Sequence, residues 1–168
     1  RAKGGDRLKL LWLVLSSLMV FLLQTTFLLN FRFFGVAANL PLIYVVLVAL
    51  LFGNRLGLGA AVLSGILLDV LYAQAVGVNT LIFCVIAVLI DLFDEALFKD
   101  NSMTPLLLIV LGTVVYHVMY LAHAYFYNLP ILAGKFFVVL TMESIMNTLI
   151  GLLLYKYVIR RWFGYELR

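Results

Sequence analysis

Long runs of apolar residues constrain this chain more than any other feature, because each run approaches the thickness of a lipid bilayer. The first runs from Leu8 to Leu29, and 65% of the 168 residues are hydrophobic whereas only 12% are charged. A soluble domain usually carries about 25% charged and about 45–50% apolar residues, and a surface that faces water has no room for such an excess of apolar side chains. The chain is therefore predicted to fold in a membrane.

Six apolar runs predict an all-α membrane protein with six transmembrane helices, since a helix needs roughly 20 apolar residues to cross a hydrocarbon core of about 30 Å. The runs lack the alternation of apolar and polar residues that a membrane β-barrel requires. The second and fourth runs are short, so we expect them to extend into their flanks or to lie in a thinned bilayer. Within one integral membrane domain (residues 1–168), the expected spans are 8–29, 40–52, 56–72, 80–92, 105–127 and 136–159.

The positions of Lys and Arg predict that both termini lie in the cytoplasm. With the N-terminus inside and six crossings, ten of the twelve Lys and Arg residues fall on the cytoplasmic side, where membrane proteins carry their excess of positive charge. The net charge of +4 is therefore attributed to membrane orientation and not to nucleic-acid binding. The ten are Arg1, Lys3, Arg7, Lys9, Arg55, Lys99, Lys156, Arg160, Arg161 and Arg168, and the outer two are Arg32 and Lys135.

Residues 91–102, between the fourth and fifth spans, combine acidic and apolar side chains. They predict an amphipathic stretch on the inner membrane surface, whose acidity favours a protein contact over anionic lipid. A solvated linker is the alternative.

Small residues recur at intervals of four along the hairpin of the second and third spans, at Gly53, Gly57, Ala61 and Gly65. Residues four apart share one face of a helix, and small side chains let a second helix approach closely in lipid. Packing within the chain and an interface with a second copy or a partner protein both fit this stripe.

Asp69 continues the same stripe into the outer half of the membrane, where a carboxylate is costly. We expect Asp69 to accept hydrogen bonds from the turn around Gly77 and Asn79 and thereby to cap the next span. A cap needs only an acceptor oxygen, so asparagine is expected to serve there almost as well. A proton-carrying or ligand-binding role is the alternative.

A polar and aromatic face is predicted on the fifth span, where Tyr116, Tyr120 and His123 recur at helical spacing. Such a face fits a cavity of headgroup size or a partner's helix, and aromatic packing near the outer interface is the simpler alternative. On the sixth span, Glu143 and Asn147 form another inward-looking stripe. Contact with water at the outer end is the simpler alternative for Glu143.

Catalytic motifs are absent from the sequence: it contains no glycine-rich phosphate loop, no HExxH and no GxSxG. The single cysteine, Cys84, has no intrachain disulfide partner, and no Cys/His cluster suggests a metal. The chain is therefore predicted not to be an enzyme and to need no cofactor.

The hairpin of the second and third spans and the turn after it contain Asn39-Leu40-Pro41, the glycines Gly53, Gly57 and Gly59, residues 64–69 (SGILLD) and residues 77–79 (GVN). This order of motifs resembles the family of rod-shape-determining proteins called MreD. That family shows a proline-led second span, a glycine-rich third span that ends in G-x-x-x-D, and a G-x-N that follows it. Length and the six-span layout also resemble MreD, so the resemblance covers essentially the whole chain, although the C-terminal half matches only in general character and at Asn147.

This resemblance implies a non-enzymatic scaffold or regulator of peptidoglycan synthesis in the inner membrane of a rod-shaped bacterium. The implied partner is the bitopic protein MreC, with RodA, its transpeptidase and the MreB filament as indirect partners. Pairing of two copies of this chain is left open. The family is also similar in fold to the substrate-binding subunits of energy-coupling-factor transporters. That similarity implies the alternative function, a vitamin-type transporter subunit whose outer cavity is lined by Tyr116, Tyr120, His123 and Glu143.

Overall fold

The computed structural model describes residues 3–72, 77–92, 103–130 and 132–159, and this part of the chain is helical apart from loops and a single β-bridge between Phe33 and Val36. Within these described residues, the predicted all-α fold with six α-helices is confirmed. Of the predicted acidic stretch 91–102, residues 93–102 lie outside the described residues. The helices are α1 (Lys3–Thr26), α2 (Leu40–Phe52), α3 (Asn54–Tyr72), α4 (Val78–Leu92), α5 (Met103–Phe126) and α6 (Ala133–Leu153), with a 3-10 turn η1 (Leu28–Asn30) after α1 and a π-helical segment η3 (Leu154–Ile159) after α6.

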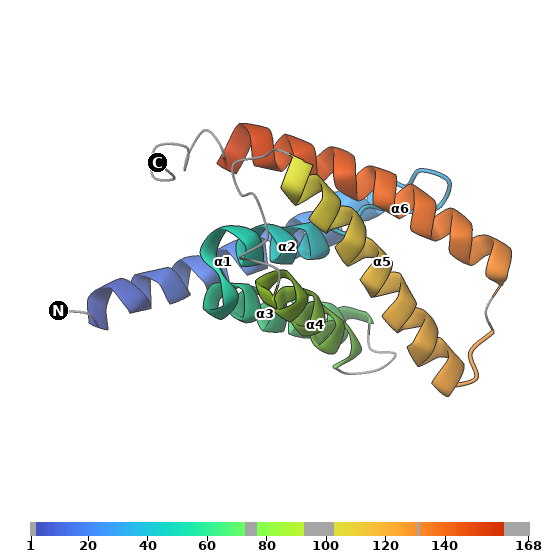
Figure 1. Ribbon diagram of the computed structural model, residues 1–168, viewed down its shortest axis with the longest axis horizontal. Coiled ribbons are helices and arrows are strands. Elements are labelled where there is room, and N and C mark those ends of the chain that lie inside the picture. Colours follow the sequence, from blue (N-terminus) through green and yellow to red (C-terminus); the bar gives the residue numbers. More distant parts are fainter. Residues whose placement is uncertain (1–2, 73–76, 93–102, 131, 160–168) are drawn as a thin grey trace.

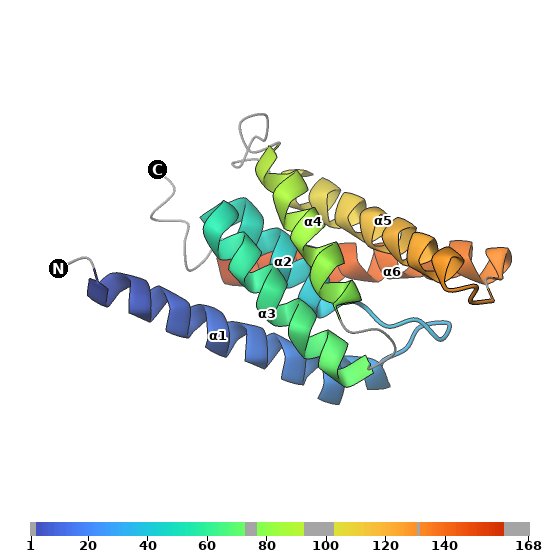
Figure 2. The ribbon, with the colours of Figure 1, turned by 90° about the horizontal axis from the view of Figure 1, so that it is seen from below.

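Consecutive helices run back and forth, so their ends gather at two sides of the bundle (Figures 1 and 2). The start of α1, the turn between α2 and α3 and the end of α6 lie at one side, and the loops after α1 and after α5 lie at the other (Figure 1). The turn from α2 into α3 is made at Gly53, whose φ of +75° is a conformation that glycine adopts without strain.

Helix α2 forms the centre of the bundle and contacts α1, α3, α4, α5 and α6. Most of its residues between Leu40 and Leu50 are buried, as expected of a helix that is apolar on all sides. Its 13 residues correspond to about 20 Å, which is shorter than the hydrocarbon core of about 30 Å. Of the two alternatives for the short spans, extension into the flanks is not observed for α2, which has the predicted bounds, whereas α4 begins two residues before its predicted start.

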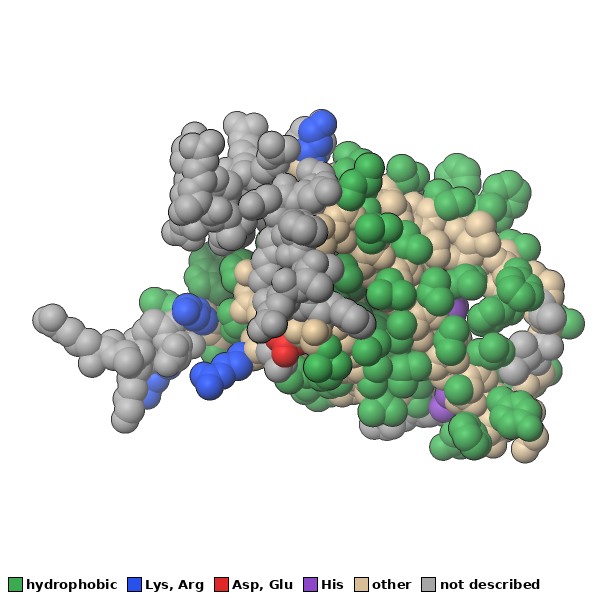
Figure 3. All heavy atoms as spheres, viewed as in Figure 1, with side chains coloured by type: hydrophobic (Ala, Val, Ile, Leu, Met, Phe, Trp, Pro, Cys, Tyr) green, Lys and Arg blue, Asp and Glu red, His purple; other side chains and the backbone are tan. Residues whose placement is uncertain are grey.

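Three helical segments are long and apolar enough to cross a membrane: Arg7–Thr26, Met103–Phe126 and Gly134–Lys156. Only 17–28% of the apolar window in each is buried inside the protein, so these helices expose wide apolar flanks that lipid would cover. In Figure 3, apolar side chains spread over the visible flank, whereas Lys and Arg side chains gather at the end where α1 begins. This arrangement is that of an integral membrane protein.

Candidate functional site

The backbone that leads into α2 lies inside the bundle, and side chains from two other helices satisfy its polar groups. Gln24 of α1 accepts a hydrogen bond from the Leu40 N–H (2.9 Å) and donates one to the Ala38 carbonyl (3.0 Å). Asn147 of α6 accepts a hydrogen bond from the Asn39 N–H (2.7 Å). In a membrane, irregular backbone is tolerated only where protein or water satisfies its polar groups. These two amides therefore allow the short helix α2 to begin inside the bundle.

Asn147 is fully buried and joins three helices through its carboxamide. Its Nδ2 donates to the Thr113 hydroxyl of α5 (3.0 Å), and that hydroxyl donates to the Ile109 carbonyl (2.8 Å). Asn39, whose backbone N–H donates to Asn147, also caps α2. Its side-chain oxygen accepts a hydrogen bond from the Leu42 N–H (3.1 Å). The hydrogen bonds of Asn147 thus connect the start of α2 to α5 and α6.

The start of α4 is held in the same way by a single carboxylate, that of Asp69 in α3. Its Oδ2 accepts hydrogen bonds from the N–H groups of Gly77 (3.0 Å) and Thr80 (3.1 Å) and from the Thr80 hydroxyl (2.7 Å). Its Oδ1 accepts from the backbone N–H and the side-chain amide of Asn79, both at 2.9 Å. Asp69 is only 3% exposed, and a buried carboxylate with five donors acts as a structural cap for α4.

This geometry changes the expectation for asparagine at position 69. A carboxylate accepts hydrogen bonds at both oxygens, whereas a carboxamide has one acceptor oxygen and an NH₂ group that donates. Donors already face both oxygens of Asp69. We therefore revise the expectation: asparagine at position 69 is expected to hold α4 less well than aspartate.

The small-residue stripe of α3 packs against other helices of the same chain. A Cβ atom on Gly57 would lie 2.7 Å from the Ala49 Cα of α2, and one on Gly65 would lie 2.7 Å from the Thr80 backbone nitrogen of α4. Ala61, between them on the stripe, is fully buried. At these positions α2 and α4 leave no space for a helix from another chain.

Gly53 differs from the rest of the predicted stripe. It lies between α2 and α3 with a φ of +75°, and a Cβ atom there would have no neighbour within 4 Å. Gly53 therefore serves the turn and is not part of the packing face. A second close contact, which the spacing of four does not include, occurs at Gly59, where a Cβ atom would lie 2.7 Å from the Leu13 Cδ2 of α1.

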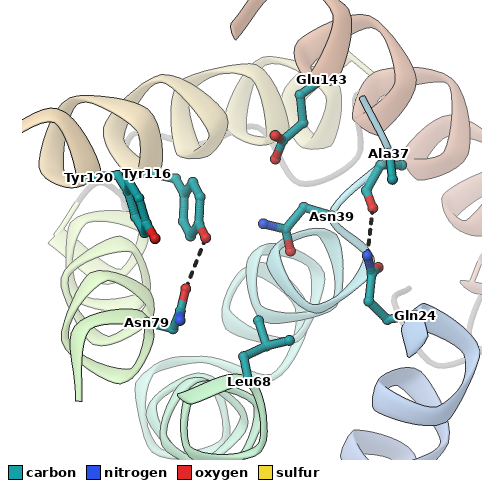
Figure 4. A pocket seen from close by; sticks show the side chains of 9 residues that line it. Gln24, Ala37, Asn39, Leu68, Asn79, Tyr116, Tyr120 and Glu143 are labelled. Atoms are coloured by element: carbon teal, nitrogen blue, oxygen red, sulfur yellow. Dashed lines mark hydrogen bonds between the residues drawn. The ribbon is translucent and has the colours of Figure 1, made fainter. Parts of the chain in front are cut away.

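A cavity of about 250 Å³ lies where the starts of α2 and α4 face α5 and α6 (Figure 4). Three of the predicted cavity residues, Tyr116, Tyr120 and Glu143, line it, whereas His123 does not. His123 lies a turn further along α5, with its ring between those of Tyr120 (5.9 Å) and Tyr127 (4.6 Å). The residues that line the cavity are Gln24, Ala37, Ala38, Asn39, Leu68, Asn79, Tyr116, Tyr120 and Glu143.

One wall of the cavity is held in place by a chain of hydrogen bonds that starts at Asp69. Asp69 fixes the side chain of Asn79, and the Tyr116 hydroxyl donates to the Asn79 Oδ1 at 2.9 Å (Figure 4). The Tyr120 ring stacks on that of Tyr116, with 6.0 Å between the ring centroids. The two tyrosines are thus positioned by the cap of α4 before anything enters the cavity.

The opposite wall carries Glu143, whose side chain is buried although it lies in the middle of α6. Its Oε2 lies 3.0 Å from the Nε2 of His117, which is also buried. Its Oε1 is buried and has no hydrogen-bond partner among the described residues. Contact with water at the outer end therefore does not explain Glu143.

Three residues of this region, Gln24, Thr113 and His117, were not among the predicted site residues. Each is a polar side chain inside an apolar run, and such residues in membrane helices usually face a partner or a cavity. That signal marks the residues but does not identify their partners, which lie on other helices. Within the part of the chain that the structure describes, no three His, Cys, Asp or Glu side chains come together as a metal site would require.

These features define a class: an integral membrane protein whose short inner helices begin on buried polar side chains. The sequence profile of a family described as rod shape-determining protein MreD matches residues 6–161, and the chain belongs to this family. No match was found among curated proteins or among solved structures. The predicted similarity to substrate-binding subunits of energy-coupling-factor transporters therefore stays a prediction.

Proposed function

We propose that this protein is a non-enzymatic scaffold that regulates peptidoglycan synthesis during rod elongation, and that it acts in the membrane with MreC. Its family is one that determines rod shape, which supports this role. The observation that carries the scaffold role is the use of Gln24, Asp69 and Asn147 to fix the helices to one another. Residues used in this way give the bundle a defined shape, which a scaffold needs.

The proposed partners follow from the family and from the apolar flanks. MreC is the direct partner, with RodA, its transpeptidase and the MreB filament further away in the assembly. Three segments, Arg7–Thr26, Met103–Phe126 and Gly134–Lys156, leave most of their apolar windows unburied, so a bitopic partner has helix surface to pack against in lipid. The transporter alternative gains no support from the cavity, because 250 Å³ lies below the roughly 300–1,000 Å³ of pockets that enclose drug-sized ligands.

A complementation experiment tests this function. In a rod-shaped bacterium that lacks its own MreD protein, expression of this chain is expected to restore rod shape. Affinity purification from the same cells is expected to recover a bitopic MreC-type protein in stoichiometric amount. The matched control is the same strain carrying the expression vector without this chain. Abundant, membrane-inserted protein that neither restores shape nor retains such a partner would contradict the proposal.

We also propose that both termini face the cytoplasm, which the gathering of Lys and Arg at one end supports (Figure 3). After Cys84 is replaced by Ala, single cysteines at Asn30 or Leu129, both exposed in loops at the other side, are expected to react with a membrane-impermeant maleimide in intact cells. A cysteine at Asn54, in the turn between α2 and α3, is expected to react only after the membrane is opened. Labelling at Asn54 in intact cells would reverse the orientation.

A further inference from the structure

The feature that the scaffold role leaves unexplained is the unpaired oxygen of Glu143 on the cavity. Glu143 is 7% exposed, and its Oε1 has no hydrogen-bond partner among the described residues. Polar atoms that are buried in a native structure are nearly always hydrogen-bonded, so each exception requires an explanation. An ionisable residue inside a membrane bundle is also costly, and its position usually marks a function. In Figure 4 the carboxyl group of Glu143 points from α6 toward the cavity.

The backbone N–H groups at the starts of α2 and α4 are already used within the chain. The backbone N–H groups of Asn39, Leu40 and Leu42 donate to side chains, and those of Asn79 and Thr80 donate to Asp69. The starts of α2 and α4 thus offer none of these N–H groups to an anion, although helix starts often bind anions. Among the described residues that line the cavity, the buried polar atom without a hydrogen-bond partner is Glu143 Oε1.

The chemistry of the lining favours a cation that donates hydrogen bonds. A carboxylate oxygen is only an acceptor, and its hydrogen bonds are strongest with a charged donor. No Lys or Arg is among the described residues that line the cavity. The rings of Tyr116 and Tyr120 lie at the same cavity, and aromatic rings attract ammonium groups.

The size of the cavity limits the ligand. A volume of about 250 Å³ exceeds several times the space of one water molecule, which takes about 30 Å³ in the liquid. It is small for a drug-sized molecule. A group of a few heavy atoms fits this range.

We propose that this cavity binds an organic ammonium group, which pairs with the Glu143 carboxylate beside the Tyr116 and Tyr120 rings. His117 positions the carboxylate by holding its other oxygen, Oε2. The ammonium group belongs either to the headgroup of an ethanolamine lipid or to a free amine, which share this chemistry. The site does not depend on the proposed role in wall synthesis, because binding can be measured on the purified protein alone.

The experiment compares two lipids and one free amine on the full-length protein purified in detergent. The protein is incubated with equal amounts of phosphatidylethanolamine and phosphatidylglycerol that carry the same acyl chains, and the retained lipid is counted by native mass spectrometry. Separately, binding of free ethanolamine is measured by saturation-transfer NMR on lipid-depleted protein. Retention of one phosphatidylethanolamine in preference, without binding of free ethanolamine, identifies a lipid headgroup, whereas binding of free ethanolamine identifies a free amine.

The variant Glu143→Gln removes the charge at nearly constant shape and is expected to weaken ammonium binding about tenfold or more, because hydrogen bonds to charged groups are the strong ones. Asp91→Asn makes the same chemical change away from the cavity and is expected to bind as the wild type does. If Glu143→Gln does not fold, Tyr120→Leu tests the aromatic side of the site.

Three results would overturn the proposal. The first is equal retention of the two lipids together with no binding of ethanolamine, which would leave water as the only occupant. The second is a preference for phosphatidylglycerol, because the site would then select an anionic lipid that has no ammonium group. The third is ammonium binding that neither Glu143→Gln nor Tyr120→Leu changes, since the cation would then lie elsewhere.

Discussion

Cells that express the Asp69→Leu variant are expected to contain little folded protein in their membranes. Leucine removes the acceptor from five donors of Gly77, Asn79 and Thr80, and each buried donor without a partner costs about 1–3 kcal/mol. Even the lower value, summed over five donors, gives about 5 kcal/mol, which matches the whole stability of a marginal protein. The first turn of α4 would lose its attachment to α3.

Asp69→Asn is expected to fall between the wild type and the leucine variant. If the amide oxygen replaces Oδ2, its NH₂ group faces the two donors of Asn79. The Asn79 side chain can rotate to present its oxygen, but it then no longer accepts from the Tyr116 hydroxyl. The Asn79 backbone N–H then stays unpaired whether or not the Asn79 side chain rotates, so we expect a loss of about 1–3 kcal/mol.

Thermal unfolding in detergent, followed by the amount of monodisperse protein after heating, measures this order. The control is Asp91→Asn, which removes a carboxylate near the end of α4, away from the hydrogen bonds of Asp69. An asparagine variant as stable as the wild type would show that the five hydrogen bonds do not hold α4. An asparagine variant that is stable but fails to restore rod shape would instead point to a role for the charge.

Gly65→Ala is expected to destabilise the protein markedly, although it adds only one carbon. The new Cβ would overlap the Thr80 backbone, with the nitrogen at 2.7 Å, and that backbone is itself held by Asp69. The nearest atoms belong to the Thr80 backbone, which cannot move aside as the end of a flexible side chain can. Helices α3 and α4 would therefore have to separate. Overpacking costs about 1–3 kcal/mol and occasionally more, and lipid tails do not replace such close helix contacts.

Two other substitutions on α3 provide the comparison. Gly59→Ala brings its Cβ to 2.7 Å from the Leu13 Cδ2, which is the end of a flexible side chain, so we expect only a small loss. Ile66→Leu changes a side chain that is 49% exposed and is expected to leave the melting temperature unchanged. If Gly65→Ala melts at the same temperature as Gly59→Ala, the close approach of α3 to α4 is not important for stability.

The number and the approximate place of the described helices follow from the sequence alone. The span predicted at 40–52 is α2 with the same bounds, because backbone in lipid must satisfy its own hydrogen bonds and the apolar run leaves only a helix to do so. Asp69 and Asn79 are ten residues apart and flank one turn, so their contact also follows from local reasoning. Such features depend on short stretches of chain and on the solvent around them.

The tertiary structure alone decided which polar groups meet. Helix α2 is apolar on every side, so its periodicity does not indicate which neighbouring helix covers which of its faces. Asn147 reaches Asn39 across 108 residues of sequence, and Glu143 meets His117 of the neighbouring helix. His123 shares the helix face of Tyr116 but lies beyond the cavity, because the axial position of a cavity depends on the helices opposite. A sequence pattern marks the side chains that need partners, whereas the crossing of the helices selects those partners.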